Sequence, residues 1–479
     1  MPPAARGRTG TRSTDATVGC GDPGVDPLAT AGRAVTPEAP RPGSPCQWPD
    51  VGRGAPSTSA PRPAVADPGR PQVGAGVARS SREVQRTSAW TPPRSLHGRR
   101  TLARVRVLIV TESFLPQING VTNSVLRVCE QLVRRGHDVA VIAPGPGPID
   151  WSGVPVIRTP SCPVPGYRDF RVALPFPAML ETLLDFGPDV VHLASPVVLG
   201  AQGATAAAQL GVPSVAVYQT DLAAYAGRYG FGVAEQAVWR RIARVHAAAA
   251  RTLAPSAAAV RQLEERGVDR VFRWARGVDL DRFHPSRRDT SLRREWAPGG
   301  EVVVGYVGRL AHEKELGLLA AVQDLPGVRL VVVGDGPQRR QLERHLHRGR
   351  FTGLLTGHGL AAAFASFDVF VHTGAHETFC QAAQEALSSG VPVVAPAAGG
   401  LLDLVLPGVN GLLFAPGSAA DLADRVRALR GSPDVRRRMG EQARRSVEGR
   451  TWDAVGRELV QHYRDVIDEA SRGSRRDAA

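Results

Sequence analysis

From residue 104 onward, short β-branched runs alternate with amphipathic segments. The first run, 105–111, is rich in Val, Leu and Ile and has the composition of a buried parallel strand. A polar loop containing Gly120 follows, and apolar residues then recur at helical spacing from 125 to 133. Gly136 and His137 are expected to end this helix, and 138–143 is the next predicted strand.

The same alternation continues to the end of the chain in two sets. The first set has predicted strands at 189–194, 213–219 and 251–255, with helices at 200–210 and 235–250. The second begins after a polar linker and has predicted strands at 302–307, 330–333, 351–355, 368–372 and 391–395. Strands that alternate with helices predict parallel sheets covered on both faces. We therefore predict an α/β protein with two Rossmann-like, doubly wound domains facing across a cleft, at 104–280 and 300–450, and a C-terminal helix at 451–470 that returns toward the first domain.

Residues 1–103 have a different composition, dominated by Pro, Gly, Ala, Ser, Thr and Arg with almost no aliphatic periodicity. Such a segment cannot bury enough apolar area to offset its chain entropy. We expect it to be a disordered extension without active-site chemistry. The alternative is a start codon further downstream, so that part of this stretch is not translated.

Charge and cysteine content narrow the function classes. The 479-residue chain carries a formal net charge of +14, largely from Arg, which suits nucleic acid, an anionic membrane surface or a phosphorylated substrate. Aromatic residues make up 5%, and no zinc-ligand spacing, helix-turn-helix cue or aromatic-basic interleaving occurs, which argues against nucleic acid. The cysteines form no CxxC pair, which predicts a reducing compartment and no structural metal; they are Cys20, Cys46, Cys129, Cys162 and Cys380. No apolar run reaches the roughly 18 residues needed to span a bilayer, and no apolar stretch follows the N-terminal arginines as in a secretory signal, so we expect a cytoplasmic protein.

Three glycine-containing turns follow predicted strands of the second domain. At 305–310, glycines would let the chain approach a phosphate, while Arg309 and Lys314 would supply positive charge to a diphosphate leaving group; the alternative is a solvated charged turn. Lys314 is expected at the start of the next helix. At 334–337 the turn is best explained structurally, with Pro337 at the first helical position. At 399–400 the glycines predict a flexible loop that either contacts the transferred group or is only a turn.

Two carboxylates, Glu377 and Glu385, follow the predicted strand near 368–373. Eight residues span about two helical turns, so both side chains can face one ligand from a single loop–helix corner. Ligands of open α/β sheets bind just past the carboxyl ends of strands, where a sugar nucleotide offers hydroxyls to carboxylates and a diphosphate to a helix N-terminus. The alternative is a chance pair on an exposed helix face.

Taken together, these motifs resemble the retaining, family-4 glycosyltransferases of the GT-B fold over residues 104–470. The order and spacing of the segments make the resemblance specific. The sequence of residues 373–381 is most similar to that of actinobacterial GDP-mannose-dependent α-mannosyltransferases. The segments that carry it are 116–121, 276–279, 283–285, 307–310 with 313–314, 334–337 and 377–385.

The resemblance implies roles for particular residues. Arg309, which is next to Gly308, and Lys314 would neutralise the departing diphosphate. Glu377 would hold hexose hydroxyls and share the catalytic role. Glu385 would bind ribose hydroxyls. The backbone around Phe379 and Cys380 would reach the sugar and phosphate, and Gly120 of the first domain would approach the diphosphate and acceptor. No cofactor and no metal are expected, in line with the lack of an Asp-x-Asp site in the second domain.

Two positions depart from the family pattern. Many relatives carry a histidine where this chain has Gln219, which cannot shuttle protons but can hydrogen bond to the donor sugar. Asp221 is then the nearest ionisable group and a candidate for acceptor positioning. Cys380 stands where glycine is common, so it either narrows the donor site or is simply a small buried residue.

The expected reaction is transfer of a hexose, mannose from GDP-mannose, to a lipid-linked or inositol-containing hydroxyl acceptor with retention at the anomeric carbon. Anionic headgroups at the inner membrane face would meet a basic surface of the first domain, unless these arginines are an ordinary solvated face: Arg168, Arg171, Arg228, Arg240, Arg241 and Arg244. The alternatives are a UDP-sugar-dependent transferase, including one acting on inositol phosphate, a sugar-nucleotide 2-epimerase, and a non-catalytic sugar-nucleotide-binding protein.

Overall fold

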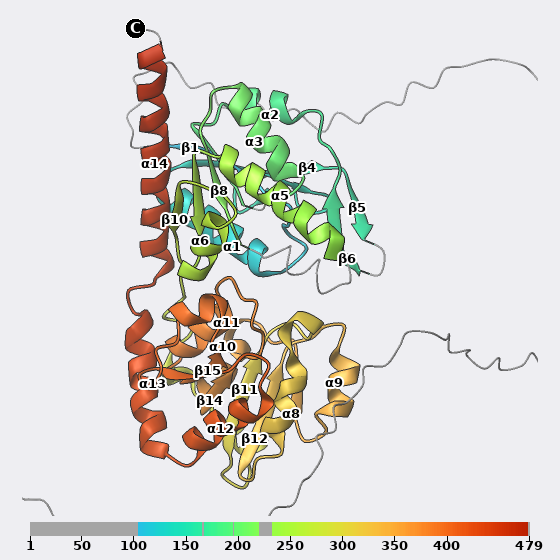
Figure 1. The fold of residues 1–479 in the computed structure, drawn as a ribbon, viewed down its shortest axis with the longest axis vertical. Coiled ribbons are helices and arrows are strands. Elements are labelled where there is room, and N and C mark those ends of the chain that lie inside the picture. Colours follow the sequence, from blue (N-terminus) through green and yellow to red (C-terminus); the bar gives the residue numbers. More distant parts are fainter. Residues whose placement is uncertain (1–103, 165–166, 195, 220–231, 478–479) are drawn as a thin grey trace, which may run out of the picture. The chain divides into compact units, whose positions relative to one another are not determined.

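The computed structural model describes residues 104–164, 167–194, 196–219 and 232–477. The segment 1–103 and Asp221 lie outside the described residues. Within them, the structure confirms an α/β protein with two separate parallel sheets (Figure 1).

The first sheet has eight strands in the order β10-β9-β8-β7-β1-β2-β4-β3. All its neighbouring strands are parallel except β3, which pairs antiparallel with β4 at the edge. The strands are β1 (Arg106–Val110), β2 (Asp138–Pro144), β3 (Asp150–Trp151), β4 (Val154–Thr159), β7 (Val190–Leu193), β8 (Ser214–Val217), β9 (Arg251–Ala254) and β10 (Val271–Arg273).

Helices connect these strands, and one antiparallel hairpin stands apart from the sheet. The helix α1 starts at a clear capping signal, because the side chain of Asn119 accepts hydrogen bonds from the backbone of Val121 and Thr122, both at 2.9 Å. It ends as predicted, where Gly136 adopts φ +77° and His137 N donates to Leu132 O. These elements are α1 (Gly120–Arg134), α2 (Met179–Phe186), α3 (Leu199–Gln209), α5 (Gly232–Ala248), α6 (Ala257–Glu264), and the hairpin β5 (Ser161–Val164) and β6 (Tyr167–Ala173).

The second sheet has six parallel strands in the order β13-β12-β11-β14-β15-β16. The strands are β11 (Val302–Val307), β12 (Val328–Val333), β13 (Arg350–Gly353), β14 (Val369–Val371), β15 (Val393–Pro396) and β16 (Gly411–Phe414). The helices are α7 (Thr290–Trp296), α8 (Ala320–Gln323), α9 (Arg339–His345), α10 (Gly357–Ser366), α11 (Gln381–Ser388), α12 (Ala419–Arg430) and α13 (Pro433–Val447). Short 3-10 turns are η1 (Pro285–Arg287), η2 (His312–Lys314), η3 (Leu316–Leu319) and η4 (Gly399–Asp403).

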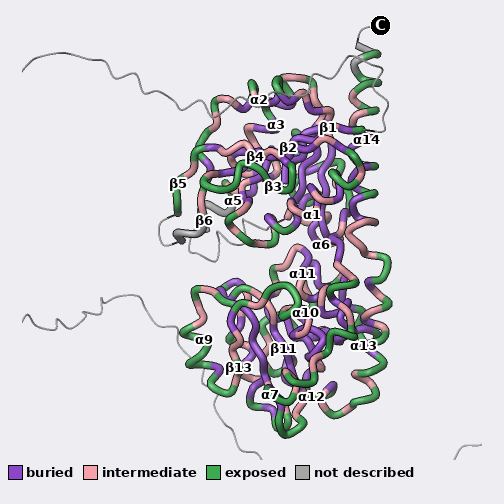
Figure 2. The backbone as a smooth tube through the Cα atoms, turned by 180° about the vertical axis from the view of Figure 1, so that it is seen from behind, coloured by how far each residue is buried: buried purple, intermediate pink, exposed green. Residues whose placement is uncertain are grey.

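Alternate strand residues of the second sheet enter different cores. Val303 belongs to one buried cluster, whereas its neighbour Val304 belongs to another. The same division separates Val107 from Leu108 in the first sheet. Both faces of each sheet are therefore covered, and Figure 2 shows the strands as buried and many outer helix turns as exposed.

The last helix, α14 (Trp452–Asp477), packs on the core of the first sheet and is longer than the predicted 451–470. Trp274 Nε1 donates to Val455 O at 3.1 Å, and His192 Nδ1 lies 2.7 Å from the buried Tyr463 hydroxyl. A segment distant in sequence thus completes the first hydrophobic core.

Two local predictions were wrong. Pro337 lies two residues before α9, whose cap is Gln338, because Gln338 N donates to Leu310 O and the chain is still in the turn at that point. Lys314 ends a 3-10 turn rather than starting an α-helix, since Glu315 follows in the left-handed region at φ +52°.

Candidate active site

The turn after β11 is held by backbone contacts. Gly308 N donates to Val333 O at 3.0 Å, and the Tyr306 hydroxyl donates to Arg309 O at 3.2 Å. Gly334 has φ +136°, and a Cβ there would lie 1.9 Å from Gly308 O, so only glycine fits. This arrangement fixes the backbone of the turn from which Arg309 extends toward solvent.

Lys314 and Glu377 form an ion pair between their Nζ and Oε1 atoms. The side chains are 19% and 16% exposed, so the pair is largely shielded from water. His372 Nε2 lies 3.0 Å from the same carboxylate oxygen. The Thr373 hydroxyl also donates to Lys314 O at 2.5 Å, which joins the two loops that carry the pair.

The charges of this cluster support one another. Burial alone would raise the pKa of Glu377, but the positive charges of Lys314 and His372 hold it well below its usual range. Burial likewise opposes a charged His372, but the neighbouring Cys380 and Glu377 raise the pKa of the imidazole to about 9. Glu377 is therefore an ionised acceptor at neutral pH, suited to ligand hydroxyls.

Arg276, to which the sequence analysis gave no role, lies near the end of the predicted first domain and joins two of its loops. Its guanidinium donates to Gly120 O and to Gln219 Oε1, both at 2.8 Å. Gln219 Nε2 in turn donates to Ala194 O at 2.7 Å. Burial lowers the pKa of Arg276 to about 10, opposed by the negative charge of Glu377. The Gln219 side chain is thus fixed on both its oxygen and its nitrogen, and its backbone carbonyl accepts from the Thr378 hydroxyl at 2.9 Å.

Comparison with known proteins places this geometry in a family. Residues 118–282 match the protein family described as "Glycosyltransferase Family 4", and residues 288–446 match the family described as "Glycosyl transferases group 1". The chain is a family-4 glycosyltransferase.

Curated relatives and solved structures agree with this assignment. A "GDP-mannose-dependent alpha-mannosyltransferase" of Mycolicibacterium smegmatis is 51% identical over 374 residues, covering 77% of this chain and 99% of the relative. A protein of the same name from Mycobacterium tuberculosis is 49% identical over 378 residues, covering 78% of this chain and 98% of the relative. Anabaena HepE, solved with UDP, superposes with a TM-score of 0.63 at 21% identity, covering 75% of this chain and 100% of HepE. This last likeness confirms the GT-B fold.

The second carboxylate of this glycosyltransferase, Glu385, lies in a different polar group. Burial raises the pKa of Glu385 to about 8, opposed by a hydrogen bond with Gln381 and by the positive charges of Arg282 and Arg127. Both arginines also approach Asp279, with N–O distances of 3.6 and 3.8 Å. Glu377 and Glu385 therefore have separate surroundings, and the expected ribose contact of Glu385 stays a prediction.

The glycines at 399–400 support the Glu377 loop and form a turn, which is one of the two outcomes that the sequence left open. They begin the 3-10 turn η4, and Gly400 N donates to Glu377 O at 2.7 Å. A Cβ on Gly400 would lie 2.4 Å from Thr378 O. Phe379 and Cys380 are 2% and 6% exposed, and Phe379 is part of the second domain's core. Among the described residues, the backbone of 377–380 is thus held in place by the glycine turn at 399–400 and by the packing of Phe379 in the core.

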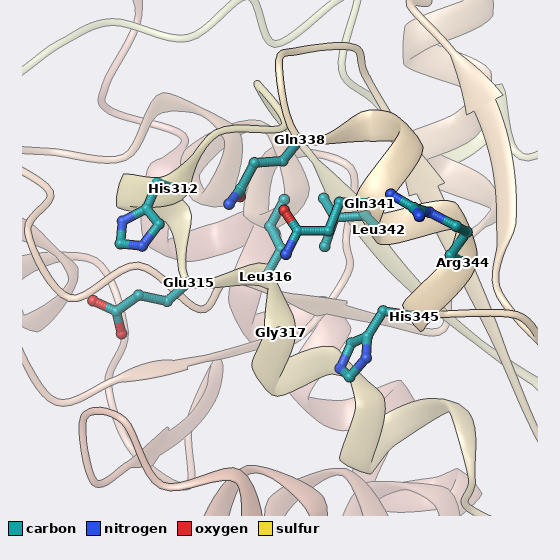
Figure 3. A pocket seen from close by; sticks show the side chains of 9 residues that line it. All are labelled: His312, Glu315, Leu316, Gly317, Gln338, Gln341, Leu342, Arg344 and His345. Carbon is teal, nitrogen blue, oxygen red and sulfur yellow. The ribbon is translucent and has the colours of Figure 1, made fainter. Parts of the chain in front are cut away.

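A cavity of about 650 Å³ is lined in part by His312 and Glu315, which stand on either side of Lys314 in the sequence. None of the predicted site residues lines it. Figure 3 shows its lining, in which Gly317, Leu316 and Leu342 lie among polar side chains: His312, Glu315, Gln338, Gln341, Arg344 and His345.

Proposed function

We propose that this glycosyltransferase moves mannose from GDP-mannose to an acceptor hydroxyl with retention at the anomeric carbon. The observation that carries the proposal is the shielded pair of Lys314 and Glu377, which combines a cation for a leaving phosphate with an ionised acceptor for sugar hydroxyls. The shared name of the two relatives at about half identity supports GDP-mannose as the donor.

The chemistry requires stabilisation of charge at two points. As the glycosidic bond to the diphosphate breaks, positive character develops on the sugar and negative charge on the phosphate. Arg309 and Lys314, on one short turn, would meet the phosphate charge. Glu377 would accept hydrogen bonds from hexose hydroxyls and orient the ring toward the acceptor. No metal is needed in this scheme, because the two cations stabilise the leaving group.

Donor binding would rearrange the existing ion pair. Lys314 now contacts Glu377, and a bound diphosphate would draw its Nζ away while hexose hydroxyls replace it at the carboxylate. His372, 3.0 Å from Glu377, would keep the carboxylate ionised during this exchange. The Glu377 carboxylate therefore stays ionised and paired both before and after the donor binds.

The nucleotide base distinguishes this proposal from a UDP-sugar-dependent transferase. Glu385 would accept hydrogen bonds from ribose hydroxyls, which GDP and UDP share, so it gives no preference between them. Calorimetric titration of the purified protein with GDP and with UDP tests the choice. Tighter binding of GDP supports the proposal, whereas tighter binding of UDP would replace it by the alternative.

The acceptor is proposed to be a lipid-linked or inositol-containing hydroxyl at an anionic membrane surface on the cytoplasmic side. Arg240, Arg241 and Arg244 of α5 are exposed and can meet headgroups at about 1 kcal/mol per well-placed cation. Arg171 is not available in the same way, because its guanidinium donates to Gly145 O and to Ser161. None of the described helices is long and apolar enough to cross a membrane.

Flotation with liposomes tests the surface proposal. The full chain should float with vesicles that contain anionic lipid and lose this binding at high salt, whereas a variant with Arg240, Arg241 and Arg244 changed to Gln should float less. Equal flotation with neutral vesicles would argue against a charge-driven surface.

The activity itself is tested with GDP-mannose and a total lipid extract, followed by mass spectrometry of the lipids. We expect a product heavier by one hexose, formed by the natural chain and formed far more slowly by the Lys314→Ala variant. Conversion of GDP-mannose without any acceptor product would indicate an epimerase or hydrolase instead, and binding without conversion would indicate a non-catalytic protein.

A further inference from the structure

Three potential metal ligands meet beside the proposed hexose contact. The imidazole of His372, the carboxylate of Glu377 and the thiol of Cys380 each offer one atom, and these atoms all lie within 4.8 Å of one another. Among the described residues, this is the group that brings together a nitrogen, a sulfur and an oxygen ligand at such short range. That combination of donors suits a borderline-soft divalent ion.

The surroundings of His372 point independently to a ligand. Its side chain is 3% exposed, yet neither ring nitrogen makes a hydrogen bond of good geometry within the described part of the chain. Nε2 lies 3.0 Å from Glu377 Oε1 without the alignment of a proper hydrogen bond. The ring of Tyr306 covers one face at a centroid distance of 6.1 Å. Both nitrogens of a buried imidazole normally have hydrogen-bond partners, so the ring nitrogens of His372 are placed to bind a further ligand.

The oxygen and sulfur ligands face the same point. Glu377 is 16% exposed, and its Oε1 atom lies 3.0 Å from His372 Nε2. Cys380 is 6% exposed and is the N-cap residue of the helix α11. Its neighbour Phe379 is locked in the core, which keeps the thiol in place.

We propose that His372, Glu377 and Cys380 form an inhibitory Zn²⁺ site at the proposed hexose contact. Coordination would release the thiol proton and any proton on His372 to solvent, with no change of oxidation state. The ion takes the carboxylate that the proposed function assigns to hexose hydroxyls and displaces Lys314 from it. Zinc and sugar nucleotide therefore exclude each other. Metal binding itself stands without the proposed function, whereas the competition rests on it.

Metal binding is tested with Co²⁺ as a spectroscopic substitute for Zn²⁺ on the full chain under reducing conditions. We expect one equivalent of Co²⁺ to give a near-ultraviolet thiolate-to-cobalt band, which Zn²⁺ then removes. Cys380→Ser and Cys380→Ala should lose the band, and Cys162→Ser, which removes an exposed thiol elsewhere, should keep it. A band of equal strength in both Cys380 variants would overturn the site.

The affinity gives a second reading. Loss of the thiolate should weaken Zn²⁺ binding by more than about 100-fold, since loss of a group outside the ligand shell already costs about 10–100-fold. Melting curves of each variant, taken without metal, show that its fold is retained. Equal Zn²⁺ affinity of the natural chain and a folded Cys380→Ser variant would contradict the proposal.

Competition is measured by titrating GDP-mannose with and without Zn²⁺. Zinc should weaken donor binding to the natural chain and to Cys162→Ser, and leave donor binding to Cys380→Ser unchanged. Unchanged donor affinity in the presence of a confirmed zinc complex would overturn the inhibitory role. If GDP-mannose does not bind even without metal, the proposed function is wrong. The cobalt band would still show whether the metal site exists.

Discussion

Replacing Lys314 with alanine removes the cation that contacts Glu377 and should affect stability and turnover to different degrees. Breaking a buried ion pair on one side typically costs about 3–5 kcal/mol. Here the two side chains are 19% and 16% exposed, and His372 remains 3.0 Å from the carboxylate. We therefore expect the free energy of unfolding to fall by only about 1–3 kcal/mol.

Turnover should fall much further than stability suggests. Loss of one group that stabilises charge in the transition state typically lowers kcat by about 10²–10³. The assay measures mannose transfer at saturating GDP-mannose alongside denaturant unfolding of the same preparation. Lys314→Arg, which keeps the charge, should retain more activity than Lys314→Ala. As a surface control, Arg348→Ala breaks an exposed pair with Asp324 at 3.7 Å and should change stability by less than about 0.5 kcal/mol.

This expectation would be refuted by a Lys314→Ala variant that unfolds with the reduced stability described but transfers mannose at nearly the natural rate. A loss of more than about 5 kcal/mol would equally contradict it, because His372 would then not compensate the carboxylate.

Three further variants test the roles of Glu385, Gly400 and Tyr463. Because burial raises the pKa of Glu385 to about 8, the contribution of Glu385 to the free energy of unfolding should fall as the pH rises from 4.5 through 8. Nucleotide affinity should rise over the same pH range. Glu385→Gln should show neither trend when stability is measured by melting and affinity by calorimetry. Gly400→Ala, whose Cβ would meet Thr378 O at 2.4 Å, should destabilise by about 1–3 kcal/mol in denaturant and reduce donor affinity, and a neutral effect would show that the loop adapts. Tyr463→Phe removes the contact with His192 and should cost about 1–2 kcal/mol in thermal unfolding without changing turnover, so a lower turnover would disprove its purely structural role.

The periodic parts of the chain were predictable because burial on both faces of a parallel sheet leaves a direct trace in sequence. The predicted strand at 302–307 matches β11, and the predicted strand at 138–143 matches β2 to within one residue. The hairpin of β5 and β6 was missed, since it is short and contains Pro163 and polar residues rather than an alternating run.

Site residues were predictable only where a motif carried them. Lys314 and Glu377 stood in recognisable segments, and the structure brings them into contact. Arg276 had no assigned role because its partners, Gly120 and Gln219, lie 156 and 57 residues away and no local pattern connects them. His372 was read as part of a buried strand, and its position beside Glu377 depends on the tertiary fold.

The single-turnover rate of mannose transfer by Glu377→Gln at saturating GDP-mannose tests most directly whether an ionised Glu377 holds the transferred sugar. Gln keeps the size of the side chain but loses the charge that accepts hexose hydroxyls and pairs with Lys314. We expect a rate at least about 100-fold below that of the natural chain, with GDP bound equally well by both. A Glu377→Gln variant that transfers mannose at the natural rate would contradict it.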